Sequence, residues 1–125
     1  MNREEVTLAV PALPEYVRLA RLTAAGVASR LGFSYDDVED LRIAVDELCY
    51  LLVGAEGRPG GITLSFAVDD AELVIVGEGP ARPGPVEFAE LSEQLLSALV
   101  DEYRIEQDDD AVTIRLVRRR RGGAG

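Results

Sequence analysis

The amino-acid sequence predicts an α+β fold, a two-layer sandwich with helices on one face of a mixed, mostly antiparallel sheet. Two observations support this fold class. Four short segments alternate apolar and polar residues, as half-buried strands do, and three longer segments repeat apolar residues every three or four positions, as amphipathic helices do. These segments follow in the order strand, helix, helix, hairpin, helix, strand, which places the helices together on one sheet face.

The first strand and the first helix are predicted near the N-terminus. Apolar residues alternate with smaller or polar ones over residues 6–10, and we expect this strand to end near Pro11. Pro14 suits the first turn of a helix, because its fixed φ matches the helix and its missing N–H is not needed there. Apolar residues then recur at helical spacing as far as Gly32, a typical stop signal.

A second helix is predicted to start after Ser34. With Asp37 three residues later, Ser34 resembles a capping box. The only cysteine, Cys49, lies between apolar neighbours and is expected to be a small buried residue rather than a reactive thiol. The Gly-rich segment 54–61 breaks the pattern and is expected to be a loop. One buried stripe runs along the helix at Val38, Leu41, Val45, Leu48 and Leu52.

The second half of the chain is predicted to complete the sheet. The runs ITLSFAV and ELVIVGEG form a hairpin, a Pro- and Gly-rich connector follows, and the alternating run AVTIRLVR closes the chain after a third helix. The apolar positions of that helix are Phe88, Leu91, Leu95, Leu96 and Leu99. We expect one domain over residues 1–118 and a flexible Arg/Gly-rich tail over 119–125, with the arginine run 118–121 as a solvated chain end.

The composition excludes several kinds of enzyme. There is no histidine, which removes the usual general base and the commonest metal ligand. All 13 basic residues are arginine, so there is neither a phosphate-loop lysine nor a lysine for Schiff-base chemistry. A single thiol without histidine cannot build an ordinary zinc site, and no metal site is expected.

Charge and hydropathy indicate where the protein works. A net charge of −10 disfavours direct binding to nucleic acid and favours a basic protein partner. No apolar run approaches the ~18 residues of a membrane span, and the N-terminus lacks an export signal. A lone cysteine also fits a reducing compartment. We therefore expect a soluble, cytoplasmic protein that does not bind membranes.

Three segments carry a resemblance to a known family: DLRIAVDELCYLLV, LVIVGEGP and LLSALVDEYRIEQDDDAVTIRLVRR. In this order they resemble the bacterial anti-sigma-factor serine kinases of RsbW type, in the GHKL ATPase superfamily, from about Val6 to Arg118. The resemblance implies the Bergerat, or histidine-kinase-like, ATPase fold with Mg-ATP between helices and sheet. It also implies two partners in stress-response transcription: a sigma factor, and an antagonist (anti-anti-sigma) protein of STAS type that is phosphorylated on serine. Family members commonly form homodimers, so a homodimer is possible.

Under this resemblance Glu47 is the candidate catalytic base. In the family's first motif, the glutamate polarises the attacking group, and an asparagine four residues later on the same helix face holds Mg²⁺. The asparagine position is Leu51, which cannot ligate a metal, and the chain's only asparagine is Asn2. We expect Glu47 to be vestigial as a base, as a solvated or paired helix residue or at the rim of a pocket filled by Leu51.

The family's second motif, Asp-x-Gly-x-Gly, contacts adenine and corresponds to the run GEGPA. Gly77 stands in place of the aspartate, Gly79 matches the middle glycine, and Ala81 replaces the last one. Glu78 lies beside the aspartate position, and strand alternation predicts that it points to the opposite face. Gly77 and Gly79 are therefore expected to be remnants of a nucleotide site.

The family's third motif is a Gly-x-Gly that receives phosphate at the start of the third helix. Its glycines align with Glu90 and Ser92, and a carboxylate there would repel phosphate. The lid between the second and third motifs is reduced to the short connector. We therefore expect neither ATP nor Mg²⁺ as a cofactor. An inactive protein is favoured over an ATP-dependent serine/threonine kinase, and the kinase stays open as the alternative.

The family's partner-binding helix is better preserved. The run LARLTAAG aligns without gaps, and Arg21 matches an arginine that contacts both sigma factor and antagonist in the family. Arg21 is the main interface candidate, with Glu15, Val17 and Arg18 as neighbours of lower rank. The alternative for Arg21 is an exposed arginine that only solvates a helix face.

Three functions are open at this point. The first is a non-catalytic anti-sigma factor under the control of an antagonist. The second is an active serine/threonine kinase and anti-sigma factor that binds Mg-ATP. The third is a pseudo-kinase adaptor that binds only an antagonist-type domain. Nucleotide binding separates the second function from the others, and sigma-factor binding separates the first from the third.

Overall fold

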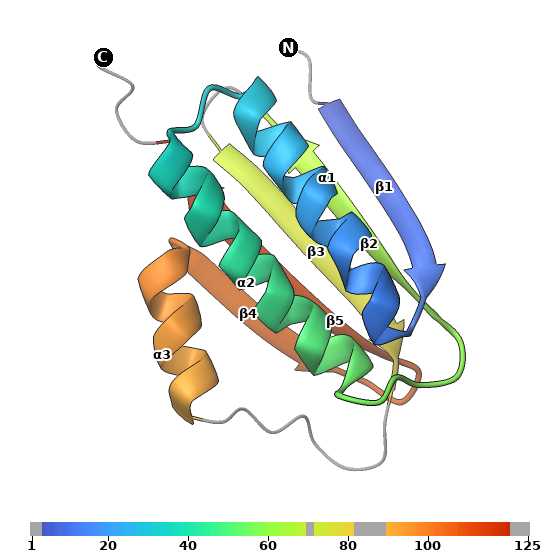
Figure 1. The fold of residues 1–125 in the computed structure, drawn as a ribbon. Coiled ribbons are helices and arrows are strands. Elements are labelled where there is room, and N and C mark those ends of the chain that lie inside the picture. The colour runs from blue at the N-terminus through green and yellow to red at the C-terminus, as the bar shows by residue number, and fades with distance from the viewer. Residues whose placement is uncertain (1–3, 70–71, 82–89, 121–125) are drawn as a thin grey trace.

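The computed structural model describes residues 4–69, 72–81 and 90–120, and only the backbone at residues 90 and 91. Figure 1 shows three helices packed side by side on one face of a sheet, with α2 between α1 and α3. A short 3-10 turn, Pro14–Tyr16, leads into α1. The helices are α1 (Val17–Arg30), α2 (Tyr35–Val53) and α3 (Glu90–Leu99), and the strands are β1 (Glu4–Pro11), β2 (Gly61–Val68), β3 (Glu72–Pro80), β4 (Glu102–Gln107) and β5 (Ala111–Arg119).

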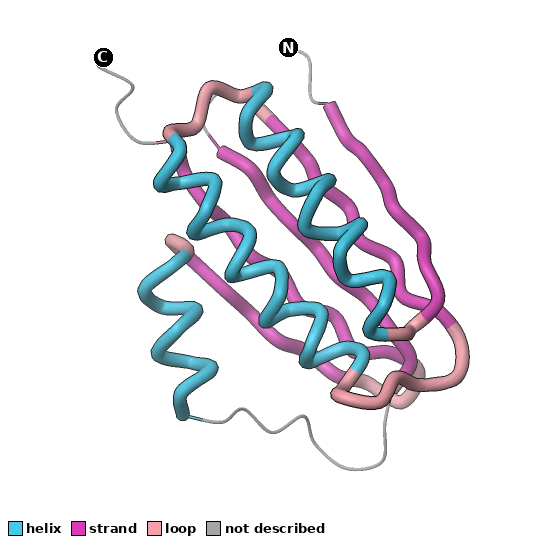
Figure 2. The backbone as a smooth tube through the Cα atoms, viewed as in Figure 1, coloured by secondary structure: helices cyan, strands magenta, loops and turns pink. Residues whose placement is uncertain are grey.

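The sheet order is β1-β2-β3-β5-β4, and each neighbouring pair among these strands is antiparallel. This confirms the α+β sandwich. The sheet has no parallel pair within the described residues, although a mixed sheet was expected. The reason is the path after β3: α3 lies near the far edge of the sheet, β4 forms that edge, and β5 returns between β4 and β3 (Figure 2).

The core lies between the sheet and the three helices. Every second strand residue points toward the helices. Helix α2 buries its predicted leucine-rich stripe against these strand residues. In contrast, α1 buries only the small residues Ala20, Ala24 and Ala28. Its large apolar residues Leu19 and Leu22 stay exposed at 44% and 55%, which leaves apolar surface on the outside of this helix.

Strand β4 is an element that the sequence analysis missed. Its apolar residues Tyr103 and Ile105 alternate with charged residues over only six positions, a weak signal for an edge strand. The turn that follows also carried a signal. Oδ1 of Asp108 accepts hydrogen bonds from the backbone N–H groups of Asp110 and Ala111 at 2.7 and 2.8 Å, as aspartates in tight turns do.

The arginine run does not begin as a solvated chain end, because Arg118 is buried. It lies on the helix-facing side of β5, where its guanidinium group donates to a carboxylate oxygen of Asp37 and to the carbonyl oxygen of Leu99. A longer contact of 3.4 Å reaches Asp40. Arg119 also belongs to β5 and pairs with Glu72 and Glu102, so the ordered domain extends past residue 118. Arg118 therefore connects β5 to the start of α2 and the end of α3.

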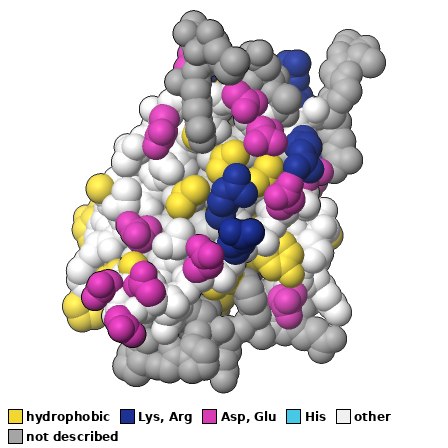
Figure 3. Space-filling model, turned by 180° about the vertical axis from the view of Figure 1, so that it is seen from behind, with side chains coloured by type: hydrophobic (Ala, Val, Ile, Leu, Met, Phe, Trp, Pro, Cys, Tyr) yellow, Lys and Arg dark blue, Asp and Glu magenta, His cyan; other side chains and the backbone are white. Residues whose placement is uncertain are grey.

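No helix in the described part of the chain covers the other face of the sheet. Seen from behind, it carries arginine side chains next to carboxylates, with apolar side chains between them (Figure 3). Ala67, Val74 and Val117 form a second small buried cluster on this face. The functional residues predicted from the sequence lie on the helical side or in the helices themselves.

Candidate functional site

Helix α2 positions the predicted residues on its two flanks. It begins at a cap in which Oγ of Ser34 accepts a hydrogen bond from the N–H of Asp37 at 3.1 Å, as predicted. It ends at Gly54, whose φ of +78° favours glycine. Glu47 contacts α3 on one flank, and Asp46 contacts α1 on the other. The predicted nucleotide residues and the predicted partner residues are therefore separated by the width of α2.

On the α3 flank, the carboxylate of Glu47 is engaged by a serine. Oγ of Ser92 donates a hydrogen bond to Oε2 of Glu47 at 2.5 Å. Both side chains are half-buried. A hydroxyl hydrogen bond to a carboxylate is short and strong, so it fixes the start of α3 against α2. Glu47 is thus a paired helix residue, one of the alternatives that the sequence left open.

Leu51 is buried on the same flank, with 6% of its surface exposed. It belongs to the main core cluster together with Leu48 and Leu52, which are also buried. Leu51, at the position of the family's metal-binding asparagine, is therefore a residue of the hydrophobic core. Among the described residues, no group of three or more acidic, cysteine or histidine side chains could hold a metal ion.

Both glycines of β3 lie against Leu52, and Gly77 lies against Leu48 as well. A Cβ atom at Gly77 would be only 2.6 Å from Cδ2 of Leu48 and 3.0 Å from Cδ1 of Leu52. At Gly79 a Cβ atom would be 3.1 Å from Cγ2 of Ile62. Real Cβ contacts are longer than the first of these distances, so a side chain at Gly77 requires the leucines to move.

Two other motif positions can be placed only in part. Glu78 is exposed, and its alternation with the buried Gly77 and Gly79 puts it on the opposite sheet face, as predicted. Ser92 lies in α3, while the side chain of Glu90 and the connector 82–89 lie outside the described residues. The expected phosphate repulsion by Glu90 and the short lid therefore stay predictions.

On the α1 flank, Arg21 forms an ion pair with Asp46. Nε of Arg21 lies 2.8 Å from Oδ1 of Asp46, and the two side chains are 37% and 46% exposed. These two atoms are enclosed, but the N–H does not point at the oxygen, so within the described structure neither atom has a hydrogen-bond partner. Arg21 was predicted from the sequence as an interface residue, whereas Asp46 was not. The available signal for Asp46 was that it directly precedes Glu47 in the same helix, so that the two side chains point in different directions.

Burial dominates the electrostatics of this flank. It raises the pKa of the Asp46 carboxyl, and the guanidinium groups of Arg21 and Arg42 offset this only in part. It also raises the pKa of the Cys49 thiol to about 12, with a further contribution from the charge of Asp46. Cys49 therefore carries almost no thiolate at neutral pH, which agrees with its predicted role as a buried apolar residue.

A hollow of about 360 Å³ opens beside the Arg21–Asp46 pair, between the start of α1 and the end of α2. Its other lining residues are mainly apolar: Pro14, Val17, Cys49, Tyr50, Val53, Gly54 and Ala55. Tyr50 is 57% exposed at this hollow. Of the other predicted partner residues, Arg18 and Glu15 are exposed nearby in α1 and the preceding turn. We call this hollow with Arg21, Asp46 and Tyr50 the α1–α2 face.

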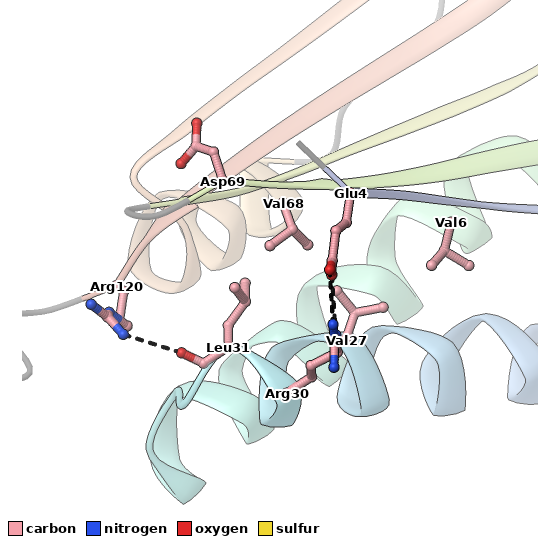
Figure 4. Close-up of a pocket in the computed structure, with 8 residues that line it drawn as sticks. All are labelled: Glu4, Val6, Val27, Arg30, Leu31, Val68, Asp69 and Arg120. Carbon is pink, nitrogen blue, oxygen red and sulfur yellow. Dashed lines mark hydrogen bonds and ion pairs between the residues drawn. The ribbon is translucent and has the colours of Figure 1, made fainter. Parts of the chain in front are cut away.

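A second hollow, of about 560 Å³, lies at the opposite end of α1 (Figure 4). Valine and leucine side chains line it, and the Glu4 carboxylate accepts two hydrogen bonds from Arg30, at 3.0 and 2.8 Å. Arg120 reaches the carbonyl oxygen of Leu31 at 3.3 Å on the other side. This hollow contains none of the residues predicted for nucleotide or partner binding.

Comparison with known proteins agrees with this architecture. The sequence profile of the histidine kinase-like ATPase domain matches residues 10–118. The chain belongs to the histidine kinase-like ATPase family. Within this family it is of the RsbW type, because it is 34% identical to the serine-protein kinase RsbW of Bacillus subtilis (strain 168), over 94% of this chain and 86% of the relative. The serine-protein kinase RsbW of Bacillus pumilus is 38% identical, over 72% of this chain and 57% of the relative.

A solved structure has the same fold as this family member. The crystal structure of the RsbU and RsbW domains of a Mycobacterium tuberculosis protein matches with a TM-score of 0.73 and 19% sequence identity. The match covers 93% of this chain and 32% of that longer chain. In the part of this chain that the structure describes, no helix is long and apolar enough to cross a membrane.

Proposed function

We propose that this RsbW-type protein is an anti-sigma factor that binds its sigma factor through the α1–α2 face and does not need nucleotide. The observation that supports this best is the contrast between the flanks of α2. The α1 flank offers a cation, an exposed tyrosine and an open hollow. A protein interface of this kind typically centres on arginine and aromatic side chains beside a pocket.

Mg-ATP does not fit the residues of the other flank. Leu51 supplies no metal ligand, Leu48 and Leu52 leave no room for a side chain at Gly77, and Ser92 engages the carboxylate of Glu47. Each of these features supports a protein in which the nucleotide site no longer functions. Glu47 then acts as a structural link between α2 and α3 rather than as a base.

Control by an antagonist of STAS type belongs to the same proposal. The relatives are named serine-protein kinases. The resemblance to the RsbW type implies a sigma factor and an anti-anti-sigma protein as partners. Two partners that use one arginine would compete for it, so the antagonist can release the sigma factor without phosphate transfer. A homodimer of the kind that family members commonly form, through the sheet and the first helix, stays an open part of this proposal.

The test is affinity capture from the native cell, followed by calorimetry with the purified sigma factor with and without Mg-ATP. Our proposal expects equal affinity in both conditions and no heat of binding for Mg-ATP alone. Micromolar binding of Mg-ATP would instead favour the active kinase, which the names of the relatives also suggest. Capture of an antagonist-type domain without any sigma factor would favour the adaptor.

A further inference from the structure

The arginine at the centre of the α1–α2 face is not free in the isolated protein. Asp46 holds its guanidinium group at ion-pair distance, 2.8 Å between Nε and Oδ1. Any partner that uses Arg21 must therefore compete with a carboxylate of the same chain. Asp46 is next to Glu47 in sequence but faces the other way, toward α1.

The Arg21–Asp46 pair is a poor one in geometry. The two facing atoms are shielded from water, yet within the described residues neither of them makes a hydrogen bond. An enclosed donor and an enclosed acceptor without aligned partners cost free energy. The raised pKa of Asp46 agrees with this cost, since burial destabilises the ionised carboxylate more than the nearby arginines stabilise it. A better-aligned carboxylate could replace Asp46 at Arg21.

The adjacent hollow is mainly apolar, in contrast to the charged Arg21–Asp46 pair. Apart from Arg21 and Asp46, its lining is free of charged side chains, with Val17, Cys49 and Val53 among its walls. Its volume of about 360 Å³ is in the range of small binding pockets. A segment that fits both features must carry a carboxylate for Arg21 and an apolar side chain for the hollow.

We propose that Asp46 is an internal competitor that occupies the place of a partner carboxylate on Arg21, and that an apolar side chain of the same partner segment enters the hollow. This inference rests on the proposed function, because it requires a protein partner at the α1–α2 face. The partner segment is acidic at one position and apolar at a neighbouring one. The free protein divides its time between a closed Arg21–Asp46 pair and an open arginine, which lowers the apparent affinity by the open fraction.

The test compares Asp46→Asn with Glu4→Gln in binding to the purified sigma factor identified by capture. Glu4 is the matched control, because it also pairs with an α1 arginine, Arg30, and its change alters the net charge equally. We expect Asp46→Asn to bind about three- to tenfold more tightly than Glu4→Gln. Loss of an acidic charge alone would weaken attraction to a basic partner, so the expected gain has the opposite sign to the general charge effect.

A second variant tests the hollow. Ala55 is exposed and lines it, so Ala55→Trp fills the hollow from its rim without disturbing the core. We expect at least tenfold weaker binding, with circular dichroism and melting unchanged. Asp46→Ala serves as a replacement if the asparagine variant does not fold.

The outcomes separate this inference from the function on which it rests. If wild type binds no sigma factor, both are wrong. If wild type binds but Asp46→Asn is no tighter than Glu4→Gln, only the competitor role is wrong. If Ala55→Trp binds as tightly as wild type, the hollow takes no partner side chain.

Discussion

Gly77 offers a direct test of whether the space above β3 is closed. We consider Gly77→Asp, which restores the aspartate of the resembling ATPases at this position. The new Cβ atom would lie 2.6 Å from Cδ2 of Leu48 and 3.0 Å from Cδ1 of Leu52. These leucines are themselves buried, so they have little room to retreat. The substitution therefore combines a steric conflict with a carboxyl group in an apolar layer.

The magnitude follows from these two parts. Overpacking of a filled core costs about 1–3 kcal/mol. A buried polar group without a partner costs about 1–3 kcal/mol more, even when the carboxyl stays protonated. Together we expect a loss of about 2–6 kcal/mol in the free energy of unfolding. This is a large share of the ~5–15 kcal/mol of a typical domain and lowers the melting temperature by about 8–24 °C.

The assay is chemical and thermal unfolding, followed by circular dichroism, with two control variants. Gly77→Ala keeps the steric part alone and should cost about 1–3 kcal/mol. At Gly26, inside α1, a new Cβ would have no atom within 4 Å apart from its chain neighbours and the adjacent helix backbone, so Gly26→Ala should stabilise the protein by about 0.5–1 kcal/mol. If Gly77→Asp melts within ~2 °C of wild type, the leucines do not close this space. Binding of Mg-ATP by that variant would show that the nucleotide site can be restored.

Four further predictions concern the two flanks of α2 and the end of the sheet. Leu51→Asn should destabilise by about 2–4 kcal/mol in urea unfolding, from lost burial and an unpaired amide; unchanged stability together with ATP binding would contradict this. Ser92→Ala should cost about 1–2 kcal/mol by removing the hydrogen bond to the Glu47 carboxylate, while Ser97→Ala on the exposed side of α3 should cost almost nothing. Arg118→Met should cost about 3–5 kcal/mol, because the carboxylate of Asp37 loses a buried partner; a cost below 1 kcal/mol would refute a structural role. Arg21→Glu should weaken sigma-factor binding by about 2–5 kcal/mol in calorimetry while the protein stays folded, and wild-type affinity would reduce Arg21 to a surface residue.

Most of the fold could be predicted because the period of its apolar residues is clear. The alternation of residues 6–10 and the stripe from Leu41 to Leu52 depend only on which face each element buries. Strand β4 was missed because it lies at the sheet edge, where charged residues alternate with only two apolar ones. Edge strands commonly carry charge, so their pattern is weaker than that of a central strand.

Arg118 was also missed, although the sequence contained a signal. Val112, Ile114 and Leu116 alternate toward the core, and the same period places residue 118 on the buried face. The run of four arginines suggested a solvated end instead. Arg118 can be buried because Asp37 and Asp40 at the start of α2 lie next to its guanidinium group. That proximity is a property of the tertiary fold.

The candidate site could be predicted in some of its residues but not in its pairs. A resemblance can identify Glu47 and Arg21, but it cannot predict that Ser92 binds the first and Asp46 binds the second. Each pair joins two helices, and their relative rotation is decided by packing between side chains far apart in sequence. The sequence predicts which residues share one face of a helix, and the structure identifies the side chain that each of them contacts.

Under the proposed function, the two flanks also explain how nucleotide chemistry could be lost while partner binding is kept. The Glu47–Ser92 link and the packing of Leu51 lie between α2 and α3, while Arg21, Asp46 and the hollow lie between α2 and α1. Substitutions at sites that share no partner usually act independently on stability. An asparagine could therefore be replaced by leucine on one flank, gaining apolar burial, without disturbing the arginine on the other. Under the proposed function the cost falls on catalysis alone, because binding of the partner uses the other flank.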